Sequence, residues 1–152
     1  MATMNRPHRW TSEKGAELVE FALVFPLLLL VVLGIVDFGF LFQRYEVLTN
    51  AAREGARVAV LPGYAAADVT VRVQQYLTAG GLTATATIAP IAPTAVTVGG
   101  SCMTMAGVTV TYPHDYTFVG GIIGYFSGTT WTSRTLTATA SMRYEGAAMA
   151  CP

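Results

Sequence analysis

Apolar residues dominate one long segment near the start of the chain. They run without a charge from Phe21 to Val36 and continue after Asp37 from Phe38 to Gln43. Counting Asp37 as tolerated, residues 21–42 reach the roughly 20 mostly apolar residues that a membrane-spanning helix needs. Leu27–Leu33 is apolar on every helical face, and the rest of the 152-residue chain is too small to wrap such a helix. We therefore predict a transmembrane span over residues 21–42.

The helix is expected to continue beyond the membrane, because the next stop signal is Pro62-Gly63. This predicts one helix over residues 16–62. Ala51, Gly55 and Ala59 recur every four residues and lie on one helical face. Such small residues let another backbone approach closely. The partner is either the protein's own β-sheet or a neighbouring helix in a filament, and the pattern does not separate the two.

The remaining residues, 63–152, alternate between apolar and polar positions in short segments. Asp68–Leu77 predicts a short helix with Val69, Val73 and Tyr76 on one face. Val119–Phe126, apolar and rich in glycine, predicts a loop packed on the sheet, with an exposed patch for a partner as the alternative. Four further segments predict strands separated by glycine and proline: Thr83–Ile88, Ala95–Val98, Val108–Tyr112 and Leu136–Tyr144.

These elements predict an α+β fold: a long N-terminal transmembrane helix that continues into a small domain with an antiparallel β-sheet, the plan of a pilin. The positive charges on the two sides of the span balance, so they do not fix its orientation. A Thr-rich C-terminal part without lysine and with two cysteines is typical of an exported domain. We expect the N-terminus in the cytoplasm and residues 63–152 outside it.

The segment before the span has a distinct pattern of its own. Gly15 and Ala16 are followed by Glu20 at the head of the apolar run, which resembles type IV pilin-like proteins. That resemblance implies cleavage between Gly15 and Ala16 and removal of residues 1–15. Glu20 would then pair with the free α-amine of a neighbouring subunit. The alternative is a simple interaction with the helix dipole, which Glu17 provides equally well.

Two residues inside the span require a physical explanation. Pro26 removes a backbone donor and predicts a kink or local loosening, with ordinary membrane-helix composition as the alternative. Asp37 lies near the outer end of the span, where it is an interfacial or an intramembrane acid. We favour a carboxylate that reaches the interface over one with an intramembrane partner, because a buried carboxylate is costly without a partner.

The two cysteines, Cys102 and Cys151, are expected to form a disulfide, since a small exported domain usually needs such a link. Free thiols or a bond to another subunit are the alternatives.

Composition gives little support for catalysis or for nucleic-acid binding. The net charge is zero, and the expected mature chain has no basic run. His8 lies in the leader and His114 is expected beside Asp115 in a turn, so neither belongs to a set of spaced metal ligands. No nucleophile elbow or phosphate-binding loop is present. We expect no enzyme activity, no metal and no cofactor.

Two long strings carry a resemblance to a known family. GAELVEFALVFPLLLLVVLGIVDFGFLF followed by LTNAAREGARVAVLPG resembles the TadE-like family, pseudopilin-type components of the Tad machinery that builds type IVb Flp pili. VTVTYPHDYTFVGG and TLTATASMRYEG are similar to that family's C-terminal strands.

The resemblance implies a structural or assembly role as a pseudopilin or minor pilin in the bacterial inner membrane. The implied partners are a prepilin peptidase, other pilin-like subunits, the Tad inner-membrane platform with its assembly machinery, and the lipid bilayer. The alternative function is a single-pass anchored domain that binds outside the cytoplasm and has no filament role.

Overall fold

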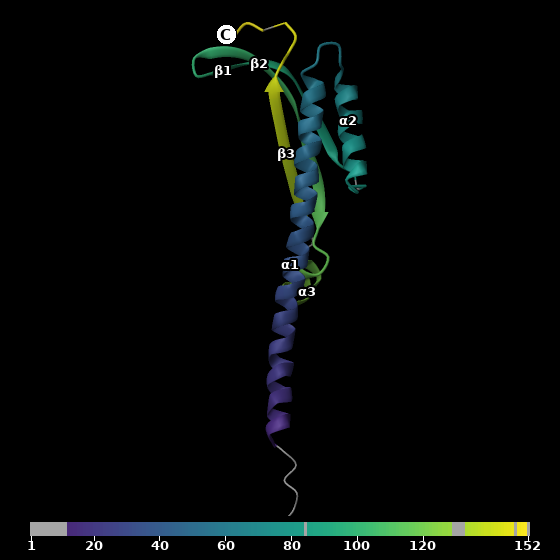
Figure 1. Ribbon diagram of the computed structural model, residues 1–152, viewed down its shortest axis with the longest axis vertical. Helices are drawn as coiled ribbons and strands as arrows, with labels where there is room; N and C mark the ends of the chain where they lie inside the picture. Colours follow the sequence, from purple (N-terminus) through teal and green to yellow (C-terminus); the bar gives the residue numbers. More distant parts are fainter. Residues whose placement is uncertain (1–11, 84, 129–132, 148, 152) are drawn as a thin grey trace, which may run out of the picture.

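The computed structural model of the protein describes residues 12–83, 85–128, 133–147 and 149–151. A long apolar helix is followed by a small domain with a three-stranded antiparallel sheet, so the predicted α+β class is confirmed (Figure 1). In chain order the elements are α1 (Ser12–Ala59), α2 (Ala66–Ala79), β1 (Thr87–Val98), β2 (Ser101–Asp115), α3 (Val119–Ser127) and β3 (Ser133–Arg143).

Helix α1 extends over 48 residues and is continuous through Pro26. It begins before Gly15, earlier than the expected start at Ala16, because one glycine costs a helix only about 1 kcal/mol. Gly15–Ala59 is long and apolar enough to cross a membrane, and no residue of its most apolar stretch is buried inside the protein. The lower half of α1 stands alone, whereas the upper half packs on the domain (Figure 1).

The sheet has the order β1-β2-β3, and all its pairs are antiparallel. The upper half of α1 and α2 pack against the sheet, with Leu48 of α1, Val73 of α2 and Val110 of β2 fully buried between them. Alternate residues of β2 from Ala106 to His114 face this core. Helix α2 confirms the short helix that was predicted from Asp68 to Leu77 and extends it at both ends.

Strand β1 unites two segments for which separate strands were predicted. It continues through Pro90 and Pro93 with a bulge between Ile91 and Thr94. Proline removes a ladder donor, and an edge strand such as β1 tolerates that loss. The turn to β2 consists of Gly99 and Gly100, whose φ angles of 58° and 80° suit a tight hairpin. The expected strand start at Thr83 is wrong, since β1 begins only at Thr87.

Two further expectations from the sequence are corrected. Val119–Ser127 forms a helix, α3, instead of a loop packed on the sheet. His114 and Asp115 lie at the end of strand β2 instead of in a turn. Pairing of β2 with β1 ends at Thr111, so Pro113 lies where only β3 is a neighbour and its missing N–H is tolerated.

The predicted disulfide between Cys102 and Cys151 is confirmed, with Cα atoms 5.9 Å apart. It joins the start of β2 to the C-terminal segment. That segment is also held by hydrogen bonds from Tyr144 N to Thr104 O and from Met149 N to Thr104 Oγ1, both 2.8 Å long. The last residues are therefore fastened to the end of the β1–β2 hairpin.

Candidate functional site

The most unusual contact in the protein joins Asp37 of α1 to the start of α3. Oδ1 of Asp37 accepts a hydrogen bond from Thr117 N (3.1 Å), and Oδ2 accepts two, from Phe118 N (2.9 Å) and Val119 N (2.7 Å). Asp37 is only 2% exposed. Unpaired N–H groups and the positive end of the helix dipole both favour a carboxylate at this position. Asp37 thus caps a helix that begins about 80 residues later in the chain.

This arrangement differs from the favoured expectation for Asp37. A carboxylate that reaches towards the interface would be exposed, whereas this one is buried and bonded inside the protein. The partner is a set of backbone donors instead of a charged side chain. One acid thereby fixes α3 against the apolar part of α1.

A second contact lies two helical turns further along α1. Nη1 of Arg44 donates a hydrogen bond to Nδ1 of His114 on β2, at 3.0 Å. Because a guanidinium has only donors, His114 must accept through Nδ1 and carry its proton on Nε2 when neutral. The ring of Tyr116 makes T-shaped contacts with the rings of His114 and Phe38, with centroids 5.1 Å and 6.4 Å apart. We call Asp37, Phe38, Arg44, His114 and Tyr116 the junction cluster.

The electrostatics of the junction cluster favour a neutral His114. The side chain is 1% exposed, and burial is the main cause that lowers its pKa from the ordinary 6.5. The guanidinium of Arg44 lowers this pKa further, while Asp115 and Asp37 act in the opposite direction. A protonated His114 would also lose its acceptor atom for Arg44. The pair is therefore intact only while the imidazole is uncharged.

We expect the stability of the protein to fall as the pH drops through about 6.5. The folded state has the lower pKa, so below pH 6.5 the unfolded chain binds a proton that the folded chain does not. The free energy of unfolding is then highest above pH 6.5 and declines towards the folded-state pKa. Thermal unfolding of the full chain in mild detergent, from about pH 7.5 to about pH 5.5, measures this decline.

The matched control for that experiment is His114→Gln, which keeps an acceptor for Arg44 but does not titrate. All other titrating groups are shared by the two proteins. The stability difference between the natural protein and the variant should therefore shrink or reverse on acidification. Parallel pH profiles would show that His114 does not contribute to the pH dependence.

The other residues singled out from the sequence lie apart from the junction cluster. Gly15, Ala16 and Glu20 are exposed in the first turns of α1. The small residues of the upper helix face inward: Ala51 is fully buried, and a side chain at Gly55 would collide with Val73 of α2 and Val108 of β2. Their neighbours in the structure are thus the protein's own α2 and sheet.

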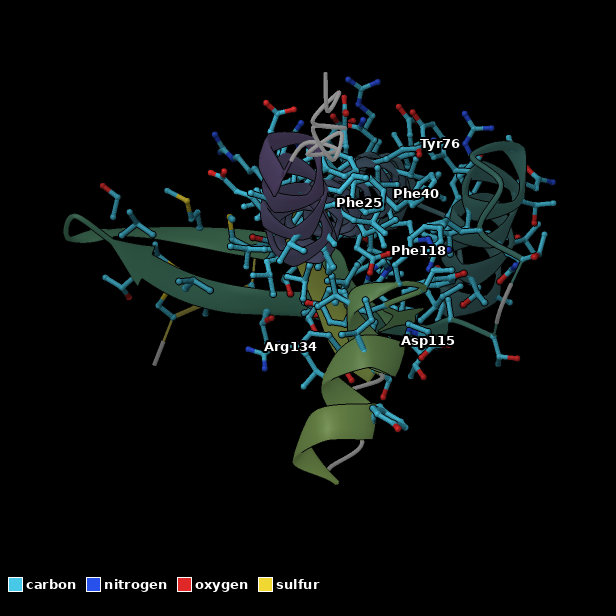
Figure 2. All side chains as sticks on the ribbon, turned by 90° about the horizontal axis from the view of Figure 1, so that it is seen from below. Phe25, Phe40, Tyr76, Asp115, Phe118 and Arg134 are labelled. Carbon is cyan, nitrogen blue, oxygen red and sulfur yellow. A yellow bond between two sulfur atoms is a disulfide. The ribbon has the colours of Figure 1, made fainter. Side chains whose placement is uncertain are left out.

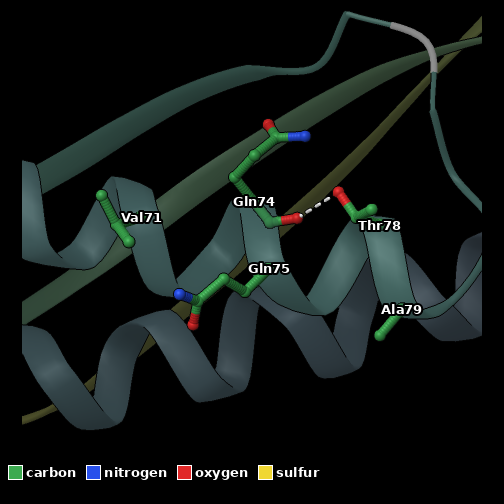
Figure 3. A pocket seen from close by; sticks show the side chains of 5 residues that line it. All are labelled: Val71, Gln74, Gln75, Thr78 and Ala79. Carbon is green, nitrogen blue, oxygen red and sulfur yellow. Dashed lines mark hydrogen bonds between the residues drawn. The ribbon is translucent and has the colours of Figure 1, made fainter.

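One surface hollow lies over α2 and offers little chemistry. The hollow on the outer side of α2 has a volume of about 540 Å³ and is lined by Val71, Gln74, Gln75, Thr78 and Ala79. Figure 3 shows that Thr78 turns its hydroxyl back to the carbonyl oxygen of Gln74, at 2.8 Å. No titratable side chain lines this hollow. Within the described residues, no group of three His, Cys, Asp or Glu side chains could hold a metal ion.

Sequence reasoning did not pair Arg44 with His114. The alternation in β2 contained the signal, since Val108, Val110, Tyr112 and His114 are two residues apart and share one face of the strand. Because the predicted strand ended at Tyr112, the prediction did not include His114 among the inward-facing residues. The hydrogen bonds of Asp37 had no comparable signal, because its partners are backbone groups.

Together, these features define a class: a small α+β protein whose sheet is carried at the end of a long, exposed apolar helix, as in pilins. Residues 15–57 match the family model of the TadE-like proteins. The match lies within α1, so the resemblance found in the sequence is confirmed for this segment. Neither curated proteins nor solved structures gave a significant match to the chain.

Proposed function

We propose that this protein is a non-catalytic pseudopilin or minor pilin that serves in the assembly of a Tad-type pilus. The observation that supports this most directly is the TadE-like match over residues 15–57, which includes the glycine, the glutamate and the apolar helix. The exposed lower half of α1 agrees with the role, since that surface needs lipid or neighbouring helices to cover it.

In the proposed function, α1 anchors the protein in the bacterial inner membrane with its N-terminus in the cytoplasm. A prepilin peptidase removes residues 1–15 by cutting between Gly15 and Ala16. Both residues are exposed, and a side chain added at Gly15 would meet no other atom within 4 Å. Other pilin-like subunits and the Tad inner-membrane platform are the proposed partners of the processed form.

Glu20 has the specific role of neutralising a neighbouring subunit's new α-amine. It is exposed on α1 and therefore accessible to another helix. A charge in the membrane is costly unless it is paired, so each subunit would be driven to place its amine beside an acid. The alternative function, an anchored binding domain without a filament, needs neither the cleavage nor this pairing.

Replacing Glu20 by Ala is expected to abolish or strongly reduce pilus output while leaving cleavage intact. The matched control is Glu17→Ala, which removes an exposed acid one helical turn away and should leave output normal. Pili are counted by electron microscopy, and the intact mass of the membrane-extracted protein shows whether residues 1–15 are missing. Normal pilus output from the Glu20→Ala strain would contradict the pairing, and an uncleaved chain would favour the alternative function.

A further inference from the structure

Helix α3 lies beside the apolar part of α1, not beside the domain core. Its first residue, Val119, lies close to Gly34 of α1: a methyl group added at Gly34 would be 3.8 Å from Val119 Cγ2, at van der Waals distance. The hydrogen bonds to Asp37 and the ring contact between Tyr116 and Phe38 lie at the same level. All three contact residues of α1 belong to the predicted span, residues 21–42.

The sequence around α3 has the composition of a lipid-facing segment. Between Asp115 and Arg134 there is no charged residue. The exposed surface of α3 is apolar or aromatic: Phe118, at its N-cap, is 38% exposed, and Tyr125 is 86% exposed. At the same level of α1, Ile35 and Phe38 are 66% and 54% exposed. Both α3 and α1 thus expose apolar surface at this level.

The direction of α3 agrees with a position in the membrane plane. Seen along α1 in Figure 2, α3 extends sideways from Phe118, whereas α1 is viewed end-on. In Figure 1 the same helix is foreshortened behind α1. An upright α1 would therefore leave α3 lying flat in the bilayer.

The depth of α3 follows from the position of Asp37, five residues before Phe42 at the end of the apolar run. With a rise of about 1.5 Å per residue, Asp37 lies roughly 7–8 Å below that end. Helices that lie in the membrane plane are typically buried about 5–10 Å at the boundary of headgroups and acyl chains. The two depths agree.

The contact with Asp37 removes the main obstacle to such a position. Backbone groups at a helix N-terminus have no water to bond in lipid, and a carboxylate there needs a partner. Asp37 and the N–H groups of residues 117–119 satisfy each other. At the other end, Gly128 N donates to Gly124 O, at 3.2 Å.

We propose that α3 is a second membrane element, which lies in the extracytoplasmic leaflet and contacts the acyl chains of the bilayer that α1 crosses. The proposal rests on the membrane anchoring in the proposed function. With α3 in the bilayer, the domain would be held at the membrane surface instead of moving freely above it. The small sheet would then have a fixed height and orientation at the membrane surface before it meets any other subunit.

The test uses quenching of tryptophan fluorescence by brominated lipids. Trp10 and Trp131 are replaced by Phe in the full chain, and a single reporter is then introduced as Tyr125→Trp on α3. The protein is reconstituted in lipid nanodiscs that hold one copy each, so that no second copy can cover α3. Lipids with bromine near the headgroup and lipids with bromine near the chain end report the depth.

Two matched reporters separate the outcomes. Leu29→Trp places the probe on an exposed position in the middle of the span, and Tyr64→Trp places it on an exposed position between α1 and α2. We expect Tyr125→Trp to lose emission about as strongly as Leu29→Trp, but with the shallow bromines more effective than the deep ones. Tyr64→Trp should be unaffected by both lipids and quenched by iodide in the water.

Each possible result is decisive. Strong quenching of Leu29→Trp with none of Tyr125→Trp overturns the position of α3 and leaves the anchoring intact. Iodide quenching of Tyr125→Trp equal to that of Tyr64→Trp overturns it as well. A Leu29→Trp protein that no brominated lipid quenches contradicts the anchoring itself, and with it both proposals.

Discussion

Replacement of Asp37 by Ala is expected to release α3 from α1 while the sheet stays folded. Three backbone N–H groups would lose their acceptor, the buried carboxylate of Asp37. A buried donor left without a partner costs roughly 1–3 kcal/mol, so the local opening of α3 should become easier by at least about 2 kcal/mol. That corresponds to roughly thirty-fold faster hydrogen exchange.

The measurement is amide hydrogen exchange by NMR in nanodiscs, read at Thr117, Phe118 and Val119. The matched variant is Asp37→Asn, which removes the charge but keeps a side-chain oxygen that caps helices about as well as aspartate. Its single oxygen can still accept from Phe118 N and Val119 N, so these two amides should keep most of their protection. Thr117 N would face the side-chain NH2 group and lose its acceptor. The amide of Val110 in the buried sheet serves as the internal reference and should be unchanged in both variants. Equal exchange in Asp37→Ala and in the natural protein would rule out the capping role.

The sequence predicted the parts of the fold that depend on local pattern. The uninterrupted apolar run gave α1, and the stop signal at Pro62-Gly63 lies just beyond the end of the helix at Ala59. The alternation of apolar and polar residues predicted the central parts of strands β2 and β3. The cysteines could be paired because the part of the chain that is predicted to be exported has only two of them, which leaves few alternatives.

The predictions from the sequence were wrong where a contact between residues far apart in the chain outweighs the local secondary-structure preference. Gly120, Gly121 and Gly124 each disfavour a helix by about 1 kcal/mol, so Val119–Phe126 was predicted as a loop. Capping by Asp37 and packing against Gly34 favour the helix instead. Neither contact can be anticipated, because one partner is backbone and the other lies about 85 residues away.

The junction cluster shows the same limit for the candidate site. In the sequence, Arg44 is one of several positive charges after the predicted span, and His114 is an isolated histidine. Their hydrogen bond depends on the register between α1 and β2, which tertiary packing sets. No periodic pattern in the sequence shows how a helix is aligned along a strand. The inward position of His114, by contrast, follows from the alternation of β2 residues once the predicted strand is extended beyond Tyr112.

Removal of the disulfide is expected to lower the free energy of unfolding by about 4 kcal/mol. Cys102 and Cys151 are 49 residues apart in sequence, and closing a loop of that size restricts the unfolded chain by this amount on the chain-entropy estimate. The variant is Cys102→Ser with Cys151→Ser, so that no single thiol remains to form a bond with another subunit. Denaturant unfolding of the full chain in detergent gives the free energy.

The natural protein treated with a reductant is the matched control, since its stability should fall to that of the double variant, which the reductant should not change. In the folded state, the loss of protection from hydrogen exchange should be confined to the C-terminal end of the chain. Glu145 N donates to Val60 O (3.0 Å) and Tyr144 N to Thr104 O (2.8 Å) without help from the disulfide, so both amides should stay protected from exchange.

The amide of Met149 lies beyond those two bonds, two residues before Cys151, and is held by the single bond to Thr104 Oγ1. It should lose its protection in the double variant, because the disulfide is the covalent link between this end of the chain and β2. A double variant within about 1 kcal/mol of the natural protein, with Met149 still protected, would mean that the C-terminal segment docks by its own contacts and that the chain-entropy estimate does not apply.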